Sequence, residues 1–99
     1  MRLRFLKSSK SMAYKVIFGD ARLARRDLDA IHPAERATIL HKIQEFASSG
    51  PYHPQSKRLR HYALAEFRLR VGSYRILYDF SSPTQTIVVL RILHRSKLY

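Results

Sequence analysis

The strongest constraint on the fold is a pair of alternating segments on either side of Gly72-Ser73. Along residues 66–71 and 74–79, apolar or aromatic side chains alternate with mostly charged ones. This period of two is typical of strands that bury one face. A two-residue connection with glycine first favours a type II′ turn. The two segments are therefore expected to form an antiparallel hairpin with one apolar face and one cationic face.

The short turn also predicts which side chains lie opposite each other. Val71 should face Tyr74, Arg70 should face Arg75, and Arg68 should face Leu77. Directly opposed like charges destabilise a hairpin, so an Arg70–Arg75 pair is easier to explain if an anion normally binds there. A phosphodiester suits this position because arginine binds its oxygens with two donors and stays charged. The alternative is a solvated face with salt bridges to Glu66 and Asp79.

The rest of the chain supplies two helices and two further strands. Residues 14–18 predict a first strand, and Asp20 is a plausible N-cap for a helix that ends near His32. Pro33 suits the first position of a second helix, which Ser48, Ser49 and Gly50 end. Its expected apolar stripe comprises Ile39, Leu40, Ile43, Phe46 and Ala47. Residues 51–56 predict a loop, and residues 86–93 predict a mostly apolar third strand of a meander.

This order of elements predicts an α+β, two-layer domain. The first strand, the helical hairpin and the antiparallel three-strand meander would form one sheet with both helices on one face. We expect a single domain over residues 12–99, preceded by a basic, poorly ordered extension over residues 1–11. No apolar run approaches the roughly 20 residues that cross a bilayer, and we expect a cytoplasmic protein without a membrane partner.

The charge of the chain points to an anionic partner. Lys and Arg number 19 against 7 Asp and Glu, which gives a net charge of +12. Such an excess in a small domain favours binding to nucleic acid or to an acidic protein, although solubility alone is the simpler explanation. Because only Glu66 and Asp79 offset the positive charge after residue 46, the polyanion site is expected in the second half.

Two basic segments flank the hairpin. Lys57, Arg58 and Arg60 lie near Tyr52 and Tyr62, and basic residues interleaved with aromatic rings suit single-stranded RNA. A solvated loop explains this run equally well. The C-terminal tail, His94 to Tyr99, adds histidine, arginine and tyrosine, which can transfer protons or stabilise a phosphate. Together these groups can support attack of an RNA 2′-hydroxyl on its neighbouring phosphate.

That reaction would need neither metal nor cofactor. The five histidines show no paired metal-ligand spacing, and the three glycines form no phosphate-binding loop. A tyrosine is a poor base at neutral pH, but nearby guanidiniums favour its phenolate.

In this order, the segments resemble the RelE/ParE toxin superfamily of bacterial toxin–antitoxin systems. The resemblance spans nearly all of residues 12–99 and rests on MAYKVIF, the helical hairpin, FRLRVGSYRILYDF and VVLRILHRSKLY. It implies a sheet with the first strand beside the last. It also implies metal-independent cleavage of messenger RNA on the ribosome, and neutralisation by a RelB-like antitoxin that wraps the toxin.

The resemblance also implies residue roles. Arg75 matches the arginine that stabilises the transition state, Arg95 the arginine assigned to the phosphate or leaving group, and Tyr99 the general base. Arg68 and Arg70 match basic positions of RelE. The expected catalytic residues are Arg68, Arg75, His94, Arg95 and Tyr99, and the expected RNA-binding residues are Lys57, Arg58, Arg60 and Arg70.

Two departures from the family pattern affect the tail. Leu93 replaces the glycine that precedes the histidine, and the sequence ends at Tyr99, which would place a terminal carboxylate beside the proposed base. His94 is then a substitute base. Two alternatives stay open: a ParE-like inhibitor of DNA gyrase without enzymatic activity, and an inactive member that serves only in an antitoxin-bound repressor complex on operator DNA.

Overall fold

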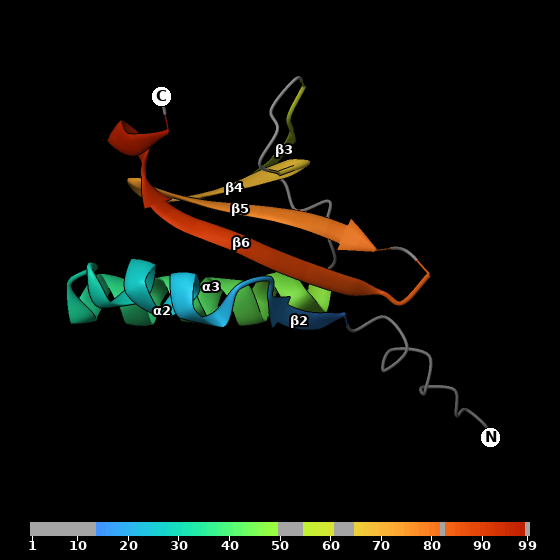
Figure 1. The fold of residues 1–99 in the computed structure, drawn as a ribbon, viewed down its shortest axis with the longest axis horizontal. Coiled ribbons are helices and arrows are strands. Elements are labelled where there is room, and N and C mark those ends of the chain that lie inside the picture. Colours follow the sequence, from blue (N-terminus) through green and yellow to red (C-terminus); the bar gives the residue numbers. More distant parts are fainter. Residues whose placement is uncertain (1–13, 50–54, 61–64, 82, 99) are drawn as a thin grey trace.

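The protein folds into two layers, a sheet and a pair of helices (Figure 1). The structure, a computed structural model, describes residues 14–49, 55–60, 65–81 and 83–98. The sheet has five strands in the order β2-β6-β5-β4-β3. Helices α2 and α3 lie on the same side of it. The predicted α+β class and its one-sided helical layer are therefore confirmed; residues 1–11 lie outside the described residues.

The two helices begin where the sequence predicts, and the first strand begins one residue later than the predicted Tyr14. Strand β2 spans Lys15–Phe18 and pairs in parallel with β6. Helix α2 spans Ala21–Asp29, and the Asp20 carboxylate accepts hydrogen bonds from the N–H groups of Arg22 and Leu23. This helix ends slightly earlier than the predicted His32. The parallel β2–β6 pairing places the first strand beside the last, as the resemblance implied.

Helix α3 spans Pro33–Ser49 and supplies most of the helical core. Proline suits its first turn because the N–H that it lacks would have no partner there. Ile39, Ile43 and Phe46 are buried, whereas Leu40 is 39% exposed. The predicted stripe was thus wrong at Leu40, which lies one residue beyond the buried face of the helix.

The predicted hairpin is confirmed in position and register. Strand β4 spans Phe67–Val71 and β5 spans Tyr74–Ser81. Val71 pairs with Tyr74, Arg70 with Arg75, and Arg68 with Leu77. Gly72 has a φ of +58°, which a residue with a Cβ adopts only under strain, and this explains why glycine opens the turn.

A short strand at the sheet edge was not predicted. Strand β3 spans Ser56–Arg58 and pairs antiparallel with β4, in a region where the sequence predicted a loop followed by a basic run. The side chain of Ser56 shares a hydrogen bond with the buried hydroxyl of Tyr78 on β5. This contact reaches beneath β4 and ties the edge strand to the centre of the sheet.

The last strand, β6, spans Thr86–His94 and contains an irregularity that changes which face its residues occupy. Tyr78 pairs with Val89, but Leu77 pairs with Arg91, so the register shifts by one residue between them. Such a bulge reverses the alternation beyond it. As a result Ile92 faces the helices, as Val89 does, and packs in the core.

The core lies between the sheet and α3. It is apolar apart from the Tyr78 hydroxyl and comprises Ile31, Ile39, Ile43, Phe46, Phe67, Leu69, Val71, Ile76, Tyr78, Ile87, Val89 and Ile92. The Tyr78 ring packs edge-on against Phe46 and stacks on Phe67. Neither described helix is long and apolar enough to cross a membrane.

Candidate nucleic-acid interface

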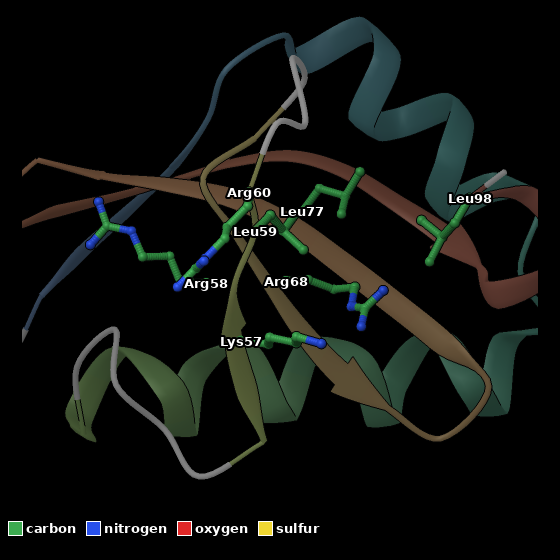
Figure 2. Close-up of a pocket in the computed structure, with 7 residues that line it drawn as sticks. All are labelled: Lys57, Arg58, Leu59, Arg60, Arg68, Leu77 and Leu98. Carbon is green, nitrogen blue, oxygen red and sulfur yellow. The ribbon is translucent and has the colours of Figure 1, made fainter.

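The sheet face that points away from the helices carries a row of cations. Lys57 on β3 lies opposite Arg68 on β4, and Arg68 lies opposite Leu77 on β5. Figure 2 shows the Lys57 and Arg68 side chains extending side by side from these strands. Neighbouring positions on one face of a sheet are about 5 Å apart, so the two charges are close enough to act on one ligand.

A pocket of about 500 Å³ opens over this row. Its apolar part comes from Leu59, Leu77 and Leu98, and its lining is completed by Lys57, Arg58, Arg60 and Arg68 (Figure 2). Leu77 is fully buried although its position in the alternation assigns it to the cationic face. An apolar floor with a cationic rim matches a nucleotide, whose base is apolar on its faces and whose phosphate is anionic.

Arg70 and Arg75 form a second pair of cations on the same face. They lie directly opposite each other across the β4–β5 hairpin. The Arg75 guanidinium folds back on its own turn, where Nη1 donates hydrogen bonds to the carbonyl oxygens of Gly72 and Tyr74, both at 2.9 Å. These carbonyl dipoles offset part of the repulsion from Arg70, which is exposed.

Among the described residues, neither Glu66 nor Asp79 forms a salt bridge with Arg68 or Arg70. In the described part of the chain the salt bridges join Arg25 to Asp29, Lys42 to Glu45, and Arg91 to Asp27. None includes Arg68 or Arg70. Asp79, one of the two acids considered as a partner, instead accepts a hydrogen bond at 2.8 Å from the backbone N–H of Glu66.

The C-terminal tail turns back toward this face. Residues Arg95–Lys97 form a short 3-10 helix, η1, and the backbone N–H of Arg95 donates to the carbonyl oxygen of Ser73 at 2.8 Å. This bond anchors the tail on the β4–β5 turn, beside the backbone of Arg75. Leu98 then lines the pocket. Tyr99, the expected base, lies outside the described residues.

His94 is not brought together with the cationic row. It pairs with Tyr74, and its ring packs edge-on against the Tyr74 ring at 5.3 Å between centroids. Tyr74 belongs to the apolar side of the hairpin, and the bulge in β6 places His94 on that same side. The His94 ring also accepts a hydrogen bond from the Ser96 N–H, so it caps η1.

Arg58 and Arg60, two of the predicted RNA-binding residues, both line the pocket but have different surroundings. Arg58 lines the pocket, but its guanidinium carbon lies 5.6 Å from the centre of the Phe67 ring, a cation–π arrangement. Arg60 is exposed and lines the pocket. The aromatic and histidine side chains that interleave this run in the sequence, Tyr52, His61 and Tyr62, lie outside the described residues.

The leucines of the pocket were not predicted from the sequence. Leu77 was assigned to the cationic face without a role, and Leu59 and Leu98 were passed over. The available signal was the exception at Leu77, an apolar side chain among charged ones at alternate positions.

Across residues 14–98, as far as they are described, no three metal-ligating side chains of His, Asp or Glu lie together.

Comparisons with known proteins give a consistent result. A family model described as the ParE toxin of the type II toxin–antitoxin system parDE matches residues 21–99. Toxin RelG of Mycobacterium tuberculosis is 37% identical over 92 residues, which cover 89% of this chain and 98% of that protein.

Two solved structures also match. The toxin–antitoxin complex RelBE2 from Mycobacterium tuberculosis has 32% identity and a TM-score of 0.74, over 87% of this chain and 95% of that chain. The RelB–RelE antitoxin–toxin complex from Methanococcus jannaschii has 27% identity and a TM-score of 0.65, over 84% and 94%.

Proposed function

We propose that this chain, which belongs to the RelE/ParE family of type II toxin–antitoxin toxins, is a ribosome-dependent endoribonuclease that cleaves messenger RNA and stops translation. The observation that carries the proposal is the pocket on the sheet face. It combines an apolar floor with the Lys57–Arg68 row and lies on the same face as the Arg70–Arg75 pair. Cations that lie this close together favour the binding of a polyanion, and the apolar floor favours a nucleic acid whose bases are exposed.

The reaction is attack of a 2′-hydroxyl on the adjacent phosphate. The 2′-oxygen bonds to phosphorus while the bond from phosphorus to the 5′-oxygen breaks, which leaves a 2′,3′-cyclic phosphate and a 5′-hydroxyl. A base takes the 2′ proton, and the leaving 5′-oxygen takes up a proton from water. Arg75 and Arg68 stabilise the charge that builds on the phosphoryl oxygens, and Arg95 binds beside the leaving oxygen. No metal is needed because guanidiniums supply the positive charge.

Tyr99 is the preferred base. His94, the substitute, caps η1 and packs against Tyr74 on the other side of the sheet, so it would have to break both contacts to reach the phosphate. Tyr99 directly follows Leu98, which lines the pocket. Guanidiniums close to a tyrosine favour its phenolate, and this would let Tyr99 accept the proton.

The partners follow from the family and from the charge. The two solved structures described above are complexes of a toxin with its antitoxin, and we infer a RelB-like antitoxin for this chain too. An acidic antitoxin segment would compete with messenger RNA for the same cations. The ribosome would present the message, and the toxin–antitoxin complex would bind operator DNA.

Expression of the chain from a tightly controlled promoter tests the proposal. We expect translation to stop within minutes, with new 5′ ends inside translated messages. Arg75→Ala and Tyr99→Phe should each abolish these cuts, whereas Arg22→Ala on the helical side should not. Full toxicity of both active-site variants would contradict the assignment.

Inhibition of DNA gyrase is the second candidate, because the matching family model is that of the ParE toxin. The same expression experiment separates the two. Loss of negative supercoiling while messages stay intact would support the gyrase candidate and overturn the nuclease proposal.

A further inference from the structure

The outer edge of strand β6 is covered by two different elements. Strand β2 pairs with its first half, from Thr86 to Val89. Beyond that point helix α2 takes over, and the N–H of Ile92 donates to the Asp27 carboxylate at 3.0 Å instead of to a neighbouring strand. A side chain therefore replaces a backbone carbonyl along this edge.

The Asp27 carboxylate accepts three hydrogen bonds from two residues. Arg91 donates from Nε to Oδ2 at 2.8 Å and from Nη2 to Oδ1 at 2.9 Å, a two-point pairing, and the Ile92 N–H adds the third bond. Asp27 is 8% exposed and is the buried charged residue of the described chain. Burial by itself would raise the pKa of Asp27, but the bonds from Arg91 and Ile92 and the charges of Arg91 and Arg26 lower it below its ordinary value.

The contact between Asp27 and Arg91 lies at the bulge of β6, and this bulge determines how the C-terminal tail leaves the strand. Arg91 is the residue that pairs with Leu77 after the register shift, Leu93 then pairs with Arg75, and the Arg95 N–H reaches Ser73. A one-residue slip at Arg91 would return the strand to the alternation set by Val89. Leu93 would then change faces, and Arg95 would lose its place on the β4–β5 turn.

Stability alone is a poor reason for a buried ion pair. Replacing such a pair with uncharged groups of similar volume is often neutral, because removing two charges from water costs about as much as their attraction returns. Fixing one register among several is the better-attested use of a buried polar group. In the observed register of β6, the two carboxylate oxygens of Asp27 accept hydrogen bonds from both the Arg91 guanidinium and the Ile92 N–H.

We propose that Asp27 is a positioning residue that, through Arg91 and the Ile92 N–H, holds the bulged register of β6 and so places Arg95 on the β4–β5 turn, where the Arg75 guanidinium also binds. The effect on catalysis rests on the proposed function, whereas the effect on register does not.

The test uses the purified full chain with Asp27→Asn, which removes the charge but keeps an acceptor for Ile92. Arg91→Lys keeps the charge but removes the two-point pairing. Asp29→Asn is the matched control, since it breaks the exposed Arg25–Asp29 pair on the same helix. We measure amide hydrogen exchange at Arg95 and at Ile76 in the centre of the sheet, together with kcat and KM for cleavage of ribosome-bound message.

For Asp27→Asn we expect exchange at Arg95 to accelerate about tenfold more than at Ile76, and kcat to fall at least tenfold with KM within about twofold. Arg91→Lys should show a smaller change of the same kind, and Asp29→Asn none. Equal acceleration at both amides, with kcat unchanged in the folded protein, means that Asp27 only stabilises the fold and overturns the proposal. If the wild-type chain cleaves no message, the proposed function fails, and the exchange ratio still decides whether Asp27 positions the tail.

Discussion

Replacing Arg70 with glutamine should change stability and RNA binding in opposite directions. Arg70 directly opposes Arg75 across the hairpin, and neither Glu66 nor Asp79 forms a salt bridge with it among the described residues. A like-charge pair in this position costs roughly 0.2–1 kcal/mol, so its removal should stabilise the free protein by about 0.5 kcal/mol. For a domain of this size, that gain corresponds to a rise in Tm of roughly 2–4 °C.

The same change should weaken binding to RNA. One lost contact between an exposed arginine and a phosphate is expected to lower affinity roughly threefold to tenfold at low salt. Each phosphate contact on a single strand contributes about 0.7 to the slope of log affinity against log salt, so the slope should fall by about that amount. Fluorescence anisotropy of a short labelled RNA, measured across a range of salt concentrations, gives both quantities.

Arg22→Gln is the matched control, because Arg22 is exposed on α2 and its loss changes the net charge equally. It should leave Tm unchanged and reduce RNA affinity much less. The reasoning is refuted if Arg70→Gln lowers Tm, or if the two variants lose the same affinity, since the charge of the whole protein would then explain binding.

Three further changes test the fold beneath the site. Gly72→Ala should cost roughly 1–2 kcal/mol of unfolding free energy, because φ at Gly72 is +58°. The added methyl group meets no atom within 4 Å, so the cost comes from the backbone conformation alone. An unchanged midpoint of urea unfolding would contradict this. Leu77→Ala should cost about 2–5 kcal/mol because Leu77 is fully buried, and a loss under 1 kcal/mol by the same assay would show that the pocket floor is not packed as described. The folded-state pKa of Asp27 is lowered, so the contribution of Asp27 to stability is present above about pH 4 and is lost as pH falls through the folded pKa. Urea titrations should therefore show that Asp27→Asn loses less unfolding free energy on acidification than the wild type does. Parallel losses in the two proteins would contradict the ion pair.

The hairpin was predictable from sequence because its determinants are local. A glycine that tolerates positive φ, a two-residue turn and strict alternation together define the register, and Arg70 lies opposite Arg75 as predicted. The helix starts were predictable for the same reason, since Asp20 acts within three residues of its own position. The parallel pairing of the first and last strands was expected only from the family resemblance.

Features that depend on distant contacts were missed. Strand β3 has three residues, two of them basic, and no alternation that would mark it; pairing with β4 and the hydroxyl of Tyr78 hold it in place. The face on which His94 lies depends on the bulge between Val89 and Arg91, which an alternating pattern cannot reveal. The ion pair of Arg91 was not predicted, because its partner Asp27 lies 64 residues earlier.

The most direct test of the account is the chemistry of the cut ends on ribosome-bound messenger RNA. We predict that the wild-type chain leaves 2′,3′-cyclic phosphates and 5′-hydroxyls, and that Arg75→Ala leaves the message intact. Cuts that end in 3′-hydroxyls and 5′-phosphates or that persist in Arg75→Ala, or intact messages in wild-type cells that lose supercoiling, would contradict the claim that this arginine face is a ribonuclease site.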